Sequence, residues 1–136
     1  MQPINQELIN ELLDKNNVFA VIGVSKDPEK YGNKIYFDLK RAGYTVYPIN
    51  PNANNISGNR CYSNLNELPQ LPNVVDIVVP PKITKEIVKE CKDLGINKVW
   101  MQPGSESLNA IGFCRENGID VLYGVCVMLE RKKCNK

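Results

Sequence analysis

Five short apolar runs rich in β-branched residues recur along the chain, with starts roughly 22 to 29 residues apart. They span residues 18–24, 45–49, 74–79, 98–101 and 120–123. The first and third runs are almost continuously apolar, which is typical of parallel strands covered on both faces. Their spacing is that of a repeated strand-and-helix unit.

Segments with helical periodicity lie between most of these runs. Ile83, Ile87 and Leu94 belong to one apolar stripe, and Ile35 and Leu39 belong to another. The helical segments are followed by glycines in positions that suit a helix C-terminus, namely Gly43, Gly95 and Gly118. We also expect an amphipathic helix before the first strand and a last helix that starts near Cys126.

The connection between the second and third runs differs from the others. Residues 50–72 are rich in Asn, Pro, Gly and Ser, and they predict only a short strand at 60–62 and a helical turn around 64–68. The whole pattern predicts a single α/β domain over residues 1–136. We expect a Rossmann-like open parallel sheet of about five main strands in the order 3-2-1-4-5, with helices on both faces.

Composition narrows the function classes. A formal charge of +2 is too small to indicate a nucleic-acid or membrane partner. No apolar run approaches the roughly 18 residues of a membrane span, and the first residues do not resemble a secretory signal, so a cytoplasmic location is expected.

The residues available for chemistry exclude further classes. The absence of histidine excludes catalysis that depends on an imidazole base. Five widely spaced cysteines without a C-x-x-C pair predict buried free thiols rather than a metal site.

In an open α/β sheet, ligands bind outside the carboxyl ends of the strands. The predicted strands end in Gly23-Val24-Ser25, Asn50-Pro51, Pro80-Pro81 and Gln102-Pro103-Gly104. These small, glycine-containing or proline-containing tips allow a ligand to approach the backbone closely. The proline pair taken alone is explained by the start of a helix, and Trp100 is predicted to lie in the core.

The first tip indicates an anion site. Gly23 ends a strand, and a helix is expected to begin near Asn33, so free backbone amides would gather there. Ser25 adds a hydroxyl, and Lys26, Lys30 and Lys34 add positive charge. A plain turn with solvated lysines is the alternative interpretation.

This loop departs from the dinucleotide-binding pattern. Ser25 and Pro28 stand where the second and third glycines of that pattern would be. Asn50 replaces the acidic residue that would hold an NAD ribose. Three lysines fit a ligand with more phosphate charge, such as the 3′-phosphorylated ADP of coenzyme A (CoA).

Taken together, the chain resembles the small stand-alone CoA-binding proteins, whose fold is that of the N-terminal domain of the succinyl-CoA synthetase α subunit. The segments that carry the resemblance are residues 20–28, 30–32, 43–44, 46–51, 57–58, 61–65, 75–79 with Pro81, 99–104, and Cys126 with Met128 and Glu130. Two positions depart from the family: Arg131 stands where members often have His, and Pro103 stands where an aliphatic residue is usual.

The resemblance implies that the first loop holds the CoA phosphates and that the neighbouring tips border the nucleotide and pantetheine. The implied binding residues are Gly23, Val24, Ser25, Lys30, Lys34, Asn50, Pro51, Val79, Pro80, Pro81, Gln102 and Gly104. No catalytic residue is implied.

We therefore expect a protein that binds CoA or an acyl-CoA through this loop, without catalysis of its own. The alternatives are a subunit of an acyl-CoA synthetase whose catalytic groups lie on a separate chain, and an NAD(P)-binding redox protein. A second copy of the chain and an acyl-CoA enzyme both remain candidate partners. Cys126 is expected to be a buried thiol, with a mixed disulfide to CoA as the alternative if it faces the groove.

Overall fold

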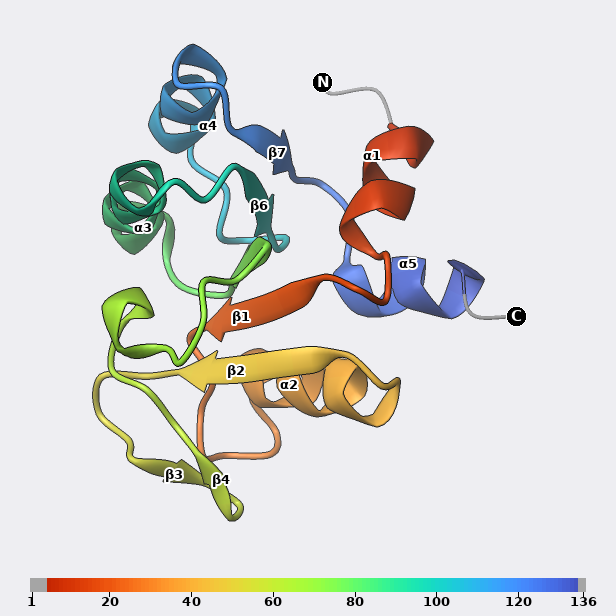
Figure 1. Cartoon of the computed structure of the whole chain (residues 1–136), viewed down its shortest axis with the longest axis vertical. Helices are drawn as coiled ribbons and strands as arrows, with labels where there is room; N and C mark the ends of the chain where they lie inside the picture. The colour runs from red at the N-terminus through yellow and green to blue at the C-terminus, as the bar shows by residue number, and fades with distance from the viewer. Residues whose placement is uncertain (1–4, 135–136) are drawn as a thin grey trace.

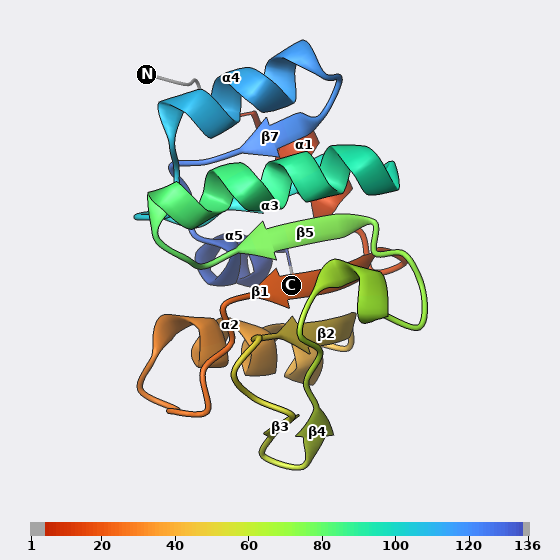
Figure 2. The same cartoon turned by 90° about the vertical axis from the view of Figure 1, so that its left-hand side faces the viewer.

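The computed structural model describes residues 5–134. A parallel five-stranded sheet forms its centre, and helices cover both faces (Figure 1, Figure 2). The main strands are β1 (Val18–Ile22), β2 (Thr45–Ile49), β5 (Val74–Ile77), β6 (Lys98–Met101) and β7 (Asp120–Leu122). The helices are α1 (Gln6–Leu12), α2 (Tyr31–Arg41), α3 (Pro81–Leu94), α4 (Leu108–Glu116) and α5 (Val127–Cys134). The predicted α/β fold is confirmed.

The sheet has the order β2-β1-β5-β6-β7, so the predicted order 3-2-1-4-5 is wrong. The third main strand, β5, pairs with β1 on the side opposite β2 instead of extending the sheet beyond β2. Pro48 supplies the physical reason, because a proline without an N–H cannot donate to a second neighbouring strand and therefore favours an edge position.

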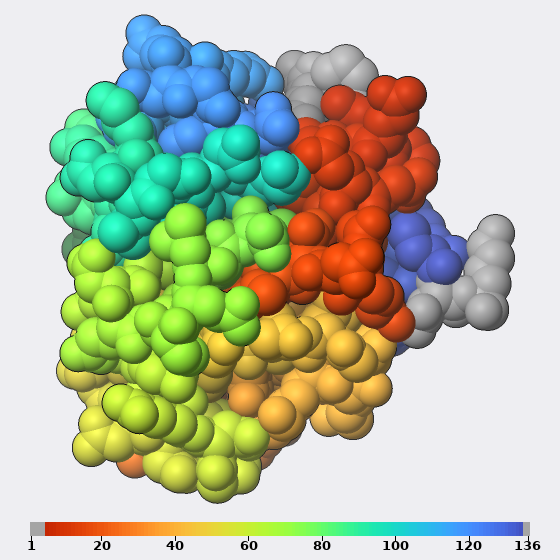
Figure 3. Space-filling view, viewed as in Figure 1, coloured from red at the N-terminus to blue at the C-terminus, as the bar shows by residue number. Residues whose placement is uncertain are grey.

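The outer side of β2 is covered by the segment that follows it. Tyr62 donates its backbone N–H to the Pro48 carbonyl over 3.0 Å, and the Asn50 N–H donates to the Tyr62 carbonyl over 2.9 Å. The space-filling view shows this segment lying against β2 (Figure 3). The expected strand at 60–62 is thus β4 (Asn59–Arg60) followed by an isolated bridge between Tyr62 and Ile49.

A small hairpin in the same connection was not predicted. β3 (Asn55–Ile56) pairs with β4 through a turn at Ser57 and Gly58, whose φ angles are 48° and 87°. Two positive φ angles define the hairpin turn type that matches strand twist, and the Ser-Gly dipeptide was the sequence signal for it. The expected helical turn is present as η1 (Leu65–Glu67).

Two apolar layers hold the helices to the sheet. On one face α1, α2 and α5 pack over a cluster that includes Phe19, Tyr36 and Trp100. On the other face α3 and α4 pack over a cluster that includes Val75 and Met101. Trp100 is fully buried, as predicted, and its indole N–H donates to the Val125 carbonyl over 3.0 Å.

Helix α5 is fastened to α2 by an ion pair. Arg131 stands at the position where the resembled family often has His, and its Nε and Nη2 donate to the two carboxylate oxygens of Asp38 over 2.7 and 3.0 Å. Such a bidentate contact fixes direction as well as distance. This departure from the family pattern therefore has a structural use here. Within the described residues, no helix is long and apolar enough to cross a membrane.

Candidate functional site

The sheet order places a crevice at the carboxyl ends of β1 and β5. From β1 the chain crosses to β2 on one side, and from β5 it crosses to β6 on the other side. Ligands of open α/β sheets bind at such a reversal. The tips of β1, β2 and β5 therefore form the candidate site, and the corrected strand order brings β1 and β5 into direct contact there.

The loop after β1 is bounded by two glycines that the backbone requires. Gly23 has a φ of 100°, and a Cβ built on it would lie 2.1 Å from the Val78 carbonyl oxygen. A Cβ on Gly32, in the first turn of α2, would lie 2.1 Å from the Gly23 carbonyl oxygen. Both approaches exclude any side chain, so the loop 23–32 is closed on itself at its base.

Two asparagine side chains fix the backbone of this loop. Asn50 Nδ2 donates to the Val24 carbonyl over 2.9 Å, and Asn33 Nδ2 donates to the Ser25 carbonyl over 2.8 Å. Asn50 was predicted to belong to the site, whereas Asn33 was missed. The signal available in the sequence was an asparagine at the expected start of a helix, and in the fold Asn33 is only 4 % exposed.

The N-terminus of α2 faces this loop without a side-chain cap. Its N-cap residue is Lys30, and its first turn contains no acidic residue. Free amides and the helix dipole therefore favour a negatively charged ligand there. Lys30 and Lys34 are exposed beside it, and Ser25 Oγ accepts the Asp27 N–H over 3.0 Å, which leaves its own hydroxyl proton free to donate.

An apolar groove of about 330 Å³ opens between the tips of β1, β2 and β5 and helix α3. Three predicted residues line it: Gly23, Pro51 and Val79. Eight further lining residues were not predicted: Ile22, Ile49, Ser63, Asn64, Leu65, Ile83, Ile87 and Glu90. Four of these eight come from α3 and η1, and only the fold brings them to the strand tips.

The β5 tip leads directly into a second uncapped helix. Pro80 is the N-cap of α3, Pro81 is in its first turn, and no side chain caps the helix. Both prolines are exposed and lie outside the groove-lining set. Val79 N–H donates to Ser105 Oγ over 3.0 Å, which ties the β5 tip to the loop after β6.

The β6 tip is arranged differently, because Gln102 is fully buried. Its Nε2 donates to Asp76 Oδ1 over 2.6 Å, and its Oε1 accepts the Val127 N–H over 3.1 Å at the start of α5. Gly104 lies on the exposed side of this tip, with its N–H on Glu106 Oε1 at 2.9 Å. The structure therefore does not bring the Gln102 side chain to the groove.

Asp76 on β5 carries a fully buried carboxyl group and was not among the predicted site residues. Its Oδ2 has no hydrogen-bond partner among the described residues. Burial raises the pKa of Asp76 to about 7, and the hydrogen bond from Gln102 opposes this rise. The carboxyl group is therefore poised between its neutral and charged forms near neutral pH.

Cys126 lies just before α5 and is half-buried, and it is hydrogen-bonded to the Tyr31 hydroxyl at the start of α2. Burial, and then the contact with Cys126, raise the pKa of Tyr31. Cys126 is not among the residues that line the groove. Cys61, Cys91 and Cys114 are buried as expected, whereas Cys134 is exposed.

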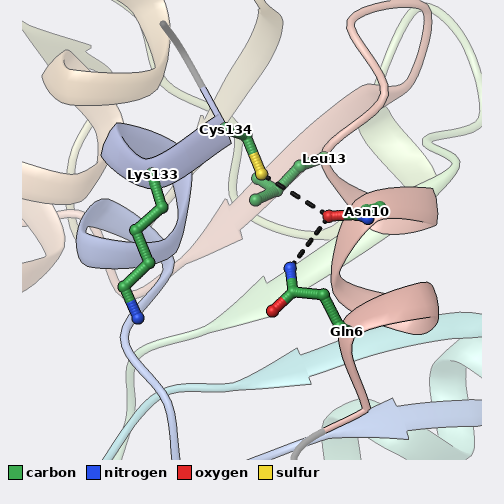
Figure 4. Close-up of a pocket in the computed structure, with 5 residues that line it drawn as sticks. All are labelled: Gln6, Asn10, Leu13, Lys133 and Cys134. Atoms are coloured by element: carbon green, nitrogen blue, oxygen red, sulfur yellow. Dashed lines mark hydrogen bonds between the residues drawn. The ribbon is translucent and has the colours of Figure 1, made fainter.

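A second hollow of about 580 Å³ lies away from the strand tips, between α1 and α5 (Figure 4). Asn10 Oδ1 accepts from Gln6 Nε2 over 2.9 Å and from Cys134 Sγ over 3.6 Å. None of the predicted binding residues lines this hollow.

Comparisons with known proteins find matches in both sequence and structure. A family model described as a CoA binding domain matches residues 17–132. Over 79 residues, 57 % of this chain, the sequence is 39 % identical to "Acetate--CoA ligase [ADP-forming] II" of Archaeoglobus fulgidus, and the match spans 12 % of that protein. Over 81 residues, 59 % of this chain, it is 37 % identical to "Acetate--CoA ligase [ADP-forming] II subunit alpha" of Pyrococcus furiosus, and the match spans 18 % of that protein.

Among solved structures, a hypothetical protein from Pyrococcus horikoshii OT3 superposes with a TM-score of 0.91 and 31 % identity. That superposition covers 98 % of this chain and 96 % of the other. This chain is thus similar in extent to that structure, whereas its matches span less than a fifth of the two enzymes named above.

Proposed function

Because this chain belongs to the family of CoA-binding domains, we propose that it binds CoA or an acyl-CoA at the crevice between the β1 and β5 tips. The observation that carries the proposal is the loop 23–32, which is closed by two glycine contacts and opens onto the uncapped N-terminus of α2. A preformed set of free amides suits a phosphate group, since the loop need not be ordered at the moment of binding.

In this proposal the loop and α2 hold the CoA phosphates. The backbone amides at the start of α2 and the Ser25 hydroxyl donate to phosphate oxygens, and Lys30 and Lys34 balance their charge. Asn50 acts indirectly, since its amide holds the Val24 carbonyl and so shapes the loop.

The apolar parts of the ligand lie along the neighbouring tips. Pro51 and Val79 form walls of the groove, while Pro80 and Pro81 place the uncapped α3 N-terminus at its rim. Gly104 leaves the β6 tip without a side chain at the exposed end of the crevice. Gln102 supports the site from within by holding β5, β6 and α5 together.

We propose binding without catalysis because three of the carboxylates near the site, those of Asp27, Glu106 and Glu130, already have structural contacts. Asp27 accepts the Glu29 N–H over 2.9 Å, and Glu106 accepts the Gly104 N–H over 2.9 Å. Glu130 is buried and accepts from Lys133 over 3.2 Å. A general acid or base must instead reach the reacting proton.

A second candidate is a role as the CoA-binding part of an acyl-CoA synthetase that acts with a separate catalytic chain. The observation that favours it is the match to one short region of two acetate–CoA ligases, one of them a subunit alpha. Copurification with a larger catalytic subunit would support this candidate. An NAD-linked role is disfavoured. The acidic residue that would bind an NAD ribose is replaced by Asn50, whose amide instead donates to the backbone of the loop.

The test is a calorimetric titration of the protein with CoA, acetyl-CoA, 3′-dephospho-CoA, NAD and NADP, alongside a thermal-shift measurement. We expect CoA or acetyl-CoA to bind most tightly and to raise the melting temperature by mass action. Weaker binding of dephospho-CoA would show that the 3′-phosphate is recognised. Stabilisation by NAD but not by CoA would overturn the proposal.

A further inference from the structure

Asp76 carries the one buried carboxyl group among the described residues that has an oxygen without a hydrogen-bond partner. Its neighbours Val75 and Ile77 belong to the apolar cluster under α3 and α4, so Asp76 points to the opposite face, which α1, α2 and α5 cover. Its register partners Val21 and Trp100 lie in the cluster on that face. The proposed contacts with CoA make no use of this carboxyl group.

The Gln102 amide connects this carboxyl group to the start of α5. Its Nε2 donates to Asp76 Oδ1 over 2.6 Å, and its Oε1 accepts the Val127 N–H over 3.1 Å. A neutral Asp76 fits this arrangement, whereas a charged Asp76 places a negative charge in an apolar layer with a single donor. Strands β1 and β6 pair with β5 on both sides, so the start of α5 is the element that can move and admit water.

The start of α5 is in turn connected to the proposed phosphate site. Cys126, the residue before α5, is hydrogen-bonded to the hydroxyl of Tyr31, the first residue of α2. The charge of Asp76 acts on the same contact, since burial, then Cys126 and last Asp76 raise the pKa of Tyr31. A displaced α5 start would therefore disturb the α2 N-terminus, and a negative charge on Asp76 would also oppose bound phosphate.

The other ionisable groups of the covering helices are paired, buried phenols or exposed. Asp38 of α2 and Arg131 of α5 bind each other, and Glu130 of α5 accepts from Lys133. Burial, and then Cys61, raise the pKa of Tyr36 on α2. Further charged side chains of these helices are exposed to solvent: Glu7, Glu11, Lys34, Lys40, Arg41 and Lys132. Asp76 is thus the group through which a pH change near neutrality acts on this face.

We propose that the ionisation of Asp76 controls how tightly this protein binds CoA. With Asp76 neutral, Gln102 holds the start of α5, and the contact between Cys126 and Tyr31 keeps the α2 N-terminus in place for the phosphates. With Asp76 charged, this arrangement loosens and the affinity falls. Because coupling between two sites is reciprocal, binding of the negatively charged ligand must favour the neutral carboxyl group and take up protons. This inference rests on the proposed CoA binding and adds its regulation by pH.

The test is calorimetric titration of the wild type and of Asp76→Asn with CoA between pH 6 and pH 8.5. Asparagine has the shape of a neutral carboxyl group, keeps an oxygen for Gln102 and cannot ionise. We expect equal affinities at pH 6, whereas at pH 8.5 the wild type should bind at least about fivefold more weakly than the variant, the lower end of typical coupling between sites. Asp120→Asn is the matched control, because Asp120 is exposed on β7 and its replacement removes the same charge, and it should keep the wild-type pH profile.

Proton uptake gives a second readout that a merely structural role of Asp76 would not move. The heat of binding is measured at pH 7 in buffers of different ionisation enthalpy, with 3′-dephospho-CoA, whose phosphates do not titrate near this pH. The wild type should take up a fraction of a proton on binding, and Asp76→Asn should take up less. The wild-type measurement needs no variant, and an absence of uptake in it would overturn the proposal.

The outcomes separate the two proposals. CoA binding with a constant ratio of affinities between the wild type and Asp76→Asn across the pH range would overturn the role of Asp76 and leave CoA binding intact. The same pH profile in Asp120→Asn as in Asp76→Asn would reveal an effect of net charge alone and would also overturn it. Absence of CoA binding by the wild type at every pH would overturn the proposed function and this inference with it.

Discussion

The tips of β1 and β6 look alike in the sequence but have different uses in the structure. Each carries a glycine with a φ near 100°, at 100° for Gly23 and 96° for Gly104, and each has a serine nearby. Gly23 packs against the backbone of the β5 tip, and its loop leads into the open N-terminus of α2. At the β6 tip, Gln102 turns inward and holds the start of α5.

The difference shows what makes a strand tip available to a ligand. Later side chains hold the β1 loop by its backbone carbonyls and by Tyr31, as Asn50 and Cys126 do, whereas at the β6 tip the start of α5 binds the Gln102 side chain itself. The residue types at the two tips would suit either ligand binding or the attachment of a helix. The element that packs on the tip decides between them.

The sharpest test of this comparison exchanges each glycine for alanine. Gly23→Ala should destabilise the protein by more than about 4 kcal/mol, because it adds a strained positive φ to a 2.1 Å clash with the Val78 carbonyl oxygen. Gly104→Ala has open space around its Cβ, so only the strain of its positive φ remains, and it should cost about 1–2 kcal/mol. Urea unfolding measures both, and equal losses would mean that the two tips are packed alike.

The buried side of the β6 tip should make stability depend on pH. The pKa of Asp76 is about 7 in the folded protein, against an ordinary value of 3.8. Because the carboxyl group ionises more readily in the unfolded chain, the free energy of unfolding is highest below about pH 4. It falls as the pH rises from there toward 7. The loss should be roughly 4 kcal/mol at pH 8 relative to pH 4.

The Asp76→Asn variant isolates this contribution, since asparagine cannot ionise. Its stability relative to the wild type should rise by that amount between pH 4 and pH 8, as measured by urea unfolding at each pH. A constant difference across this range would show that folding does not raise the pKa of the Asp76 carboxyl group.

The smallest effect is expected at the solvent side of both tips. Ser25→Ala combined with Lys30→Ala removes a hydroxyl donor and a positive charge beside the proposed phosphate site, so CoA affinity should fall by about tenfold. Glu106→Ala at the β6 tip should leave CoA affinity within about twofold, since the Glu106 carboxylate accepts a hydrogen bond from the Gly104 amide and has no part in the proposed phosphate site. Titration calorimetry compares them, and unfolding should show little change in either. A larger loss of affinity in Glu106→Ala than in the double variant would indicate that the phosphates bind at the β6 tip and would contradict the proposal.

Much of the fold could be predicted because the spacing of apolar residues along the chain indicates each strand and helix locally. The run at 98–101 is β6 as expected, and the run at 45–49 is β2. Strand order depends on pairing between distant segments, and its local clue, Pro48, lay inside a run that otherwise reads as an ordinary strand.

The candidate site was less predictable than the fold. The Gly23 loop and Asn50 were within reach, because a glycine at a strand end and a polar residue at the next tip follow a general rule of open sheets. Glu90 and Asn33 lie on helices, and only packing brings them to the tips. Gln102 shows the opposite case. Its position at a strand tip predicted a side chain that faces the ligand, but this side chain is buried and binds the start of α5.

Pro48 has one more consequence, for how the molecule behaves among other chains. Exposed sheet edges recruit strands from neighbouring molecules and so promote aggregation. Here one edge strand contains a proline and is covered at its end by Tyr62, and the other edge, β7, is three residues long. Neither edge offers a long row of backbone groups, so any self-association of this domain is left to its helical faces.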